Sequence, residues 1–152
     1  MIAKNSITRP ANTTAYSTGD VINENGSTTP ILLTYEGTTR FPFALYSHLI
    51  SSNEAGTPAI DVYLFSDSFT IAADNAAFAP TDSQMKDYYL GKISHTTWSA
   101  FAANKLSDAK PDAPIAIPTR TAPDTGVYAV LVAAGAYTPV SGEVITLKLD
   151  VD

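Results

Sequence analysis

The sequence predicts an all-β fold, a single-domain antiparallel β-sandwich with a jelly roll as the favoured topology and one or two short helical turns. Three observations lead to this prediction. The chain has 152 residues, the usual length of one domain. Its 10 prolines and 8 glycines recur at short intervals, which suits many short strands and opposes long helices. Several segments alternate apolar and polar residues with the period of two that a half-buried strand requires.

The N-terminal segment has two interpretations. Residues 1–12 form either an extended N-terminal arm or the first strand, and residues 13–152 form the sandwich domain. Ser6–Pro10 is extended in both cases, because the residue before a proline avoids the helical region. The sequence leaves both interpretations open.

Three strands are predicted in the first half of the chain. Ile31–Tyr35 is a candidate strand between two polar segments. Arg40–Ile50 is mostly apolar, but Pro42 lacks the N–H that a sheet ladder needs, so this strand starts late or lies at an edge. Ala59–Ser66 alternates with apolar residues on both faces, which is typical of a central strand in a sandwich.

Two segments have helical features. Thr81 and Gln84 have the spacing of a capping box with Thr81 as N-cap, which predicts a helical turn or two to about Tyr88. Thr97–Leu106 places Trp98 and other apolar side chains on one helical stripe. That second segment is equally well explained by a strand followed by a loop, and both interpretations stay open.

The C-terminal third carries the clearest strand patterns. Val127–Ala133 is rich in β-branched residues, which predicts a strand. Glu143–Val151 alternates cleanly and predicts a half-buried last strand that ends the chain inside a sheet. Its inward-facing residues are predicted to be Ile145, Leu147, Leu149 and Val151.

The composition excludes several classes of protein. The chain contains no cysteine, which rules out disulfides, thiolate zinc sites and cysteine nucleophiles. Its net charge of −6 argues against nucleic acid and anionic membrane as main partners. Only 16% of residues are charged, against about 25% in an ordinary soluble domain. A surface of hydroxyl and small side chains is easily desolvated and suits protein–protein contact, although strand propensity of threonine explains the composition equally well.

No targeting segment is predicted. Met1–Ser6 lacks the apolar region of a signal peptide, and no run approaches the roughly 18 apolar residues of a membrane span. We therefore expect a protein that is made in the cytoplasm and is soluble afterwards.

No catalytic residue, metal site or cofactor is predicted either. The two histidines, His48 and His95, are not accompanied by a Gly-x-Ser-x-Gly elbow that would support a nucleophilic triad. Asp61, Asp67 and Asp74 lie on three different segments and do not have the spacing of a calcium loop. There is no glycine-rich phosphate loop.

Aromatic side chains are the candidates for a carbohydrate-binding platform. The available rings are Tyr88, Tyr89, Trp98, Tyr128 and Tyr137. Aromatic residues of a β-sandwich more often belong to its core or to an interface, so packing is the alternative role.

Basic side chains near strand ends are the candidates for partner contact. In an acidic protein of low charge, arginine is a natural anchor for a partner's carboxylates or carbonyls, and a solvated or locally paired arginine is the alternative. The Ile2–Pro10 segment is the best candidate contact segment, because it is short, extended and basic. The candidate partner contacts are Lys4, Arg9, Pro10, Arg40 and Arg120.

The chain as a whole resembles a known group of proteins. The resemblance is carried by Ile7–Pro10 with Thr13–Tyr16 and Gly19–Ile22, by Asp74–Asp82, and by Ala136–Glu143. These segments together are similar to a widespread group of small structural proteins encoded by tailed bacteriophages, some of which are capsid decoration, or cement, proteins. Asp61–Phe65 and Tyr128–Val132 extend the resemblance, whereas Trp98–Thr119 does not contribute to it.

The resemblance implies a non-enzymatic virion protein that binds the outer capsid lattice and stabilises the head. It would be made in the host cytoplasm and reside on the capsid surface, with the phage major capsid protein as its partner and neither nucleic acid nor membrane involved. A homo-oligomer, such as a trimer, is expected for part of the group. A tail, baseplate or fibre component is the alternative, and a carbohydrate-binding sandwich on the virion surface is the second alternative.

Overall fold

A computed structural model of the chain describes residues 2–35, 43–52, 56–118 and 126–151. The described residues form β1 (Ile2–Thr8), β2 (Val21–Ile22), β3 (Ile31–Thr34), β4 (Phe43–Ser52), β5 (Ile60–Phe65), α1 (Asp82–Tyr88), β6 (Tyr89–His95), β7 (Ser99–Phe101), β8 (Asn104–Ala109), β9 (Ile115–Ala116), β10 (Gly126–Ala133) and β11 (Val144–Val151). All strand pairs are antiparallel. The all-β prediction is therefore confirmed.

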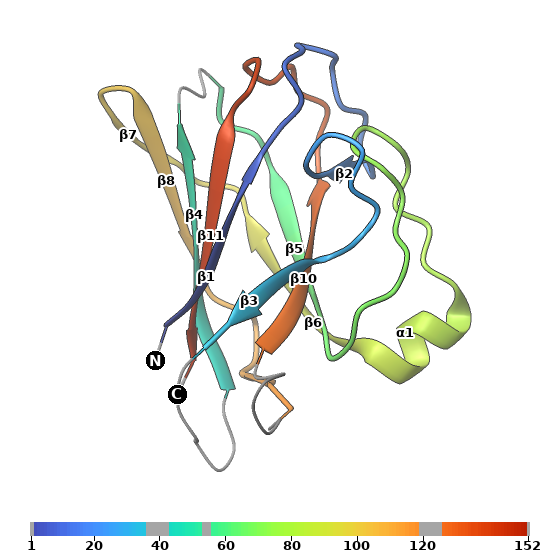
Figure 1. Cartoon of the computed structure of the whole chain (residues 1–152). Coiled ribbons are helices and arrows are strands. Elements are labelled where there is room, and N and C mark those ends of the chain that lie inside the picture. Colours follow the sequence, from blue (N-terminus) through green and yellow to red (C-terminus); the bar gives the residue numbers. More distant parts are fainter. Residues whose placement is uncertain (1, 36–42, 53–55, 119–125, 152) are drawn as a thin grey trace.

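The strands form one curled sheet. Its order is β6-β5-β10-β3-β1-β11-β4-β8-β7 (Figure 1). In addition, β2 pairs with β10 and β9 pairs with β4. The curl brings β6 against β8 and β9, so the two halves of the sheet face each other. This arrangement has the two layers of a sandwich, and the jelly-roll topology stays a prediction.

The main core lies between the two halves of the sheet. The alternation of β11 puts its predicted residues Ile145, Leu147, Leu149 and Val151 inside, where all four are buried. They pack in one cluster with inward residues of β4, β5 and β10, among them Leu49, Leu64 and Leu131. The predicted orientation of the last strand is confirmed.

A second apolar cluster covers the other side of β5 and β10. Phe65 and Val130 are buried there beneath Ile71, and Met85 of α1 packs against them. Because β5 has a core on each side, it needs apolar residues on both faces. The prediction that Ala59–Ser66 is a central strand is confirmed, since β5 pairs with β6 on one side and β10 on the other.

The two N-terminal predictions have different outcomes. Ile2–Thr8 pairs with β11 at all seven positions, so this segment is the first strand and the arm interpretation is wrong. β4 is described from Phe43, and the predicted late start falls at Arg40–Pro42, outside the described residues. It pairs with β11 on one side and β8 on the other, so the edge alternative is wrong. Pro42 itself lies outside the described residues.

The short helix forms where its cap predicts it. The Thr81 hydroxyl accepts a hydrogen bond from the Gln84 backbone N–H at 3.2 Å, and the Gln84 side chain accepts one from the Thr81 N–H at 2.8 Å. This capping box satisfies two backbone donors that a helix start leaves unpaired. The prediction of a helical segment to about Tyr88 is confirmed.

The helical interpretation of Thr97–Leu106 is wrong. This segment contains β7 and the start of β8, which form a hairpin. β8 also pairs with β4 from Asn104 to Ala109, so its backbone groups find partners across the sheet. Long-range pairing of this kind overrides a weak local preference for helix. The turn of the hairpin places Ala102 at a φ of 48°.

The strain at this turn is testable. Replacing Ala102 with glycine removes the clash between Cβ and backbone that a positive φ imposes, so we expect Ala102→Gly to raise the free energy of unfolding by up to about 1 kcal/mol. Urea denaturation of both proteins measures the difference. Ala103→Gly is the control in the same turn and is expected to be neutral or destabilising. A loss of stability in Ala102→Gly would contradict the strained turn.

Candidate functional site

One side of the β1-β11-β4-β8-β7 half faces solvent. We call its side chains the outer face. They are Ile2, Lys4, Ser6 and Thr8 of β1, Val144, Thr146, Lys148 and Asp150 of β11, Tyr46, His48, Ile50 and Ser52 of β4, Asn104, Leu106 and Asp108 of β8, and Ser99 and Phe101 of β7. Antiparallel register places these residues on the same side, because directly paired residues point to the same face.

The outer face carries exposed apolar side chains at both ends. Ile2 and Tyr46 lie at one end, with 52% and 49% of their surface exposed. Phe101 and Val144 lie at the other end, with 58% and 36% exposed. Beside Tyr46 lies a shallow pocket of about 410 Å³, which Pro111 also lines. Apolar side chains on a sheet face that are interspersed with polar ones are typical of a protein-docking surface.

A row of charged residues crosses the middle of the outer face. Its positions are Lys4, Lys148, His48 and Asp108, each paired in register with the next. The His48 ring lies between two carboxylates, with Nδ1 2.6 Å from an oxygen of Asp108 and Nε2 3.2 Å from an oxygen of Asp150. Only a protonated imidazole donates from both nitrogens, so this geometry suits the charged form.

The environment of His48 favours its proton. Partial burial alone lowers the pKa of His48, but the hydrogen bonds that the ring donates to Asp108 and Asp150 and the charges of both carboxylates outweigh it. The net pKa lies above the ordinary value for histidine. When His48 is protonated, the row is cationic from β1 to β4 and anionic at β8.

The predicted contact residues are not brought together. Lys4 lies on the outer face and is exposed. Arg9 and Pro10 are buried, so their prediction as surface contacts is wrong. Arg40 and Arg120 lie outside the described residues. Sequence reasoning missed Lys148 as the neighbour of Lys4, although the alternation of the last strand had already placed Lys148 outside.

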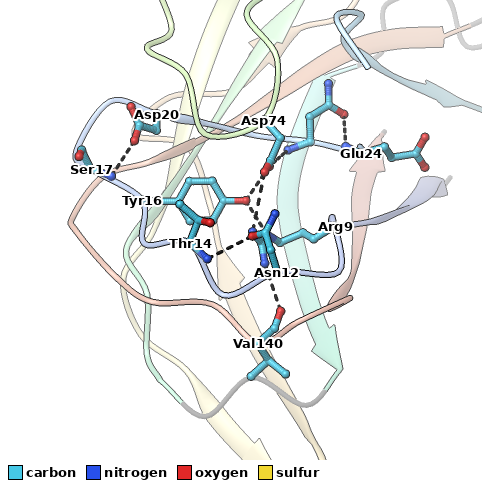
Figure 2. A network of polar contacts seen from close by, with 10 residues as sticks. Arg9, Asn12, Thr14, Tyr16, Ser17, Asp20, Glu24, Asp74 and Val140 are labelled. Atoms are coloured by element: carbon cyan, nitrogen blue, oxygen red, sulfur yellow. Dashed lines mark hydrogen bonds and ion pairs between the residues drawn. The ribbon is translucent and has the colours of Figure 1, made fainter. Parts of the chain in front are cut away.

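Arg9 is held inside by a polar network (Figure 2). Its guanidinium donates to the Tyr16 hydroxyl and, at 3.1 Å, to the Val140 carbonyl, and lies 3.8 Å from the Asp74 carboxylate. The Tyr16 hydroxyl in turn donates to Asp74 at 2.6 Å, and so does the Asn23 backbone N–H at 2.9 Å. Segments that are far apart in sequence are thus joined at one end of the sheet, which makes the role of Arg9 structural.

The charges in this network depend on one another. Burial raises the pKa of Tyr16, and the hydrogen bond to Asp74 raises it further, so the phenol stays protonated and acts as a donor. Arg9 also lies 4.7 Å from the centre of the Tyr16 ring, and Tyr137 stacks on that ring at 5.1 Å. Among the described residues, Asp74 is the carboxylate within ion-pair distance of the buried guanidinium.

The second histidine is part of the core. His95 of β6 is fully buried, and its two ring nitrogens lie 3.0 Å from the hydroxyls of Ser107 on β8 and Ser47 on β4. Burial lowers the pKa of His95 to about 4, so the ring is neutral at pH 7. The contacts connect β6 to the opposite half of the sheet. Both serines are buried as well, which gives this pair a packing role.

The three aspartates considered for calcium lie apart. Asp74 belongs to the buried network, Asp61 binds Lys92 and Ser94, and Asp67 accepts from the backbone N–H of its neighbour Ser68. Among the described residues, no group of three or more His, Cys, Asp or Glu side chains is placed to hold a metal ion. No described helix is long and apolar enough to cross a membrane.

Most of the candidate platform rings pack within the fold. Trp98 donates its indole N–H to the Pro58 carbonyl at 2.6 Å and packs on the core. Tyr137 stacks on Tyr16, Tyr88 stacks on Phe69, and Tyr128 packs on the second apolar cluster. Tyr89 is the exposed member of the set, with 39% of its surface accessible.

Comparisons with known proteins identify no family for this chain. The chain matches no protein-family model, and a search of curated proteins also returns no match.

Removing one member of the buried ion pair should destabilise the fold strongly. Replacing Arg9 with methionine leaves the Asp74 carboxylate buried without its cation, so Arg9→Met is expected to lower the free energy of unfolding by about 3–5 kcal/mol. Lys4→Met, at an exposed position on the same strand segment, is the control and should change it by less than about 0.5 kcal/mol. Urea denaturation measures both. An equal change in the free energy of unfolding for the two variants would show that the buried ion pair does not contribute to stability.

His95 should make the fold sensitive to acid. Its folded-state pKa of about 4 lies below the ordinary 6.5, so below pH 6.5 the unfolded chain binds a proton that the folded chain excludes. We expect a loss of about 3 kcal/mol as the pH falls from 6.5 to 4, and full stability from this group above pH 6.5. Urea denaturation across this range should give a shallower pH dependence for His95→Gln than for the native chain. Identical slopes would refute the buried neutral histidine.

Proposed function

We propose that this protein is a non-enzymatic structural protein of a phage virion, which docks through its outer face on another protein and decorates the outside of the capsid. The observation that carries this proposal is the outer face itself. Four exposed apolar side chains lie there around a charged row, on a sheet that provides a broad surface. Apolar anchors with polar groups between them are what a specific protein interface requires.

Three further features support the proposal. The sequence resembles small structural proteins of tailed phages. The charged fraction of 16% keeps the cost of desolvating the surface low. The buried Arg9 network and the core on both sides of β5 make the scaffold rigid, so little conformational entropy is lost when the face docks.

The mechanism would be added interface area. A decoration protein that contacts neighbouring capsid subunits opposes their separation. An interface of about 800 Å² per partner is enough for stable docking, and many copies on one lattice add their effects. The major capsid protein is the proposed partner.

The copy number of this protein in virions tests the proposal. We expect quantitative mass spectrometry of virions from the encoding phage to find this chain at a copy number comparable with that of the major capsid protein. A small fraction would assign it to the tail, baseplate or fibre instead. Complete absence from the virion would refute the proposal.

Substitutions on the outer face test whether it is the docking surface. The Tyr46→Ser/Phe101→Ser variant removes an anchor at each end of the outer face and should bind particles that lack the protein at least about 30-fold more weakly, as expected for the loss of about 2 kcal/mol. Tyr89→Ser removes an exposed ring from the other half of the sheet and is the matched control. Equal binding by both variants would exclude the outer face as the docking surface.

A further inference from the structure

Two lysines lie directly opposite each other at the centre of the outer face. Lys4 of β1 and Lys148 of β11 are register partners in the antiparallel ladder. Side chains of such a pair start about 4.5–5.5 Å apart, and like charges in this position destabilise a sheet. His48, on the other side of Lys148, adds a third cationic group to the row when it is protonated between its two carboxylates.

The carboxylates near this row are already engaged. Asp150 lies two residues after Lys148 on the same side of β11, and Asp108 lies across β4 on β8. Both are bound by the His48 ring, through Nε2 and Nδ1 respectively. Within the described residues, neither Lys4 nor Lys148 has a carboxylate within ion-pair distance.

The chain neutralises a comparable lysine elsewhere. On the outer side of β5 and β6, Lys92 lies beside Asp61, with Nζ 3.1 Å from the carboxylate. Charged residues in the whole sequence comprise 15 acidic and 9 basic ones. Two adjacent lysines without an acid between them are therefore a local positive spot on an acidic protein.

We infer that Lys4 and Lys148 together bind a carboxylate side chain on the protein partner, in an acidic segment that carries apolar residues beside the acid. This inference deepens the proposed function and rests on it for the existence of the partner. One carboxylate has two oxygens, so it can accept from both ammonium groups at once. Ile2 and Tyr46, in the next row of the sheet, would contact the apolar neighbours of that acid.

His48 regulates access to this site. The groups that face its ring are Asp108 from β8 and Asp150 from β11, while Lys148 of β11 is its register partner and Tyr46 lies on the same side of β4. While His48 is protonated, it holds both carboxylates away from the lysines. When it loses the proton, only one nitrogen can donate, and Asp150 is free to turn toward Lys148. The partner's carboxylate then competes with an internal one, so binding weakens as the pH rises through the pKa of His48.

An NMR titration of the isotope-labelled full chain with an oligoglutamate peptide tests the site. We expect shifts centred on the amides of Lys4 and Lys148, no comparable shifts with oligoglutamine, and weaker binding as the pH is raised. The Lys4→Gln/Lys148→Gln variant should bind at least about fivefold more weakly, as expected for two partly exposed ion pairs. Lys86→Gln/Lys92→Gln removes the same charge away from the outer face and should bind like the native chain.

Several results would overturn the inference. Equal weakening in both double variants would mean that only net charge matters. Tighter binding of inorganic polyphosphate than of oligoglutamate at the same two lysines would make phosphate the ligand. Lys4→Gln/Lys148→Gln is also expected to melt at the same or a higher temperature than the native chain, because it removes a repulsion. A lower melting temperature would mean that the lysines serve the fold.

The inference and the proposed function can fail separately. If the native chain is absent from virions but oligoglutamate still binds at Lys4 and Lys148, the virion role falls and the carboxylate site stands. If docking on virions depends on Tyr46 and Phe101 but not on the two lysines, the virion role stands and the carboxylate site falls.

Discussion

The pairing of β11 with both β1 and β4 is the constraint on which the rest of the structure depends. β11 contributes four inward side chains to the core, and its outward side chains occupy the middle of the outer face. The period of a strand is two, so a slip of one residue would turn the apolar set to solvent and Lys148 and Asp150 to the interior. The core thus determines which residues share a row on the opposite side. The charged row across the outer face is a consequence of how the core is packed.

The two ends of the sheet are secured by polar contacts of different kinds. At the end where β1 leaves the sheet, the Arg9 guanidinium and the Asp74 carboxylate are buried together with Tyr16. Such a pair stabilises little over an apolar substitute, but it penalises any arrangement that separates its members. Between the two halves, the neutral His95 ring connects three strands through hydroxyl groups that act as donor or acceptor. The Arg9–Asp74 pair and the His95 contacts determine which segments lie together more than they add stability.

The two outer sides of the curled sheet differ in whether other segments cover them. The outer side of β5 and β10 is covered by residues 66–81 and α1, which build the second apolar cluster. The outer face on β1, β11, β4 and β8 has no such cover among the described residues. Ile2, Tyr46 and Phe101 are therefore exposed, whereas Phe65 and Val130 on the other side are buried. This asymmetry leaves the exposed apolar side chains on one side of the molecule, together with the two unneutralised lysines at its centre.

Local pattern was enough to predict the strands and the helix cap, because alternation and capping act over a few residues. It placed Ile145–Val151 correctly, found Thr81 and Gln84, and put Lys148 outside. It failed at Thr97–Leu106, where pairing with β4 overrides a helical stripe, and at Arg9, whose burial depends on Asp74, 65 residues further along the chain. Composition alone suggested a surface suited to protein contact. The outer face, which we propose as the docking surface, was decided by tertiary structure, because the rows of a sheet join residues whose separation in sequence no local rule can relate.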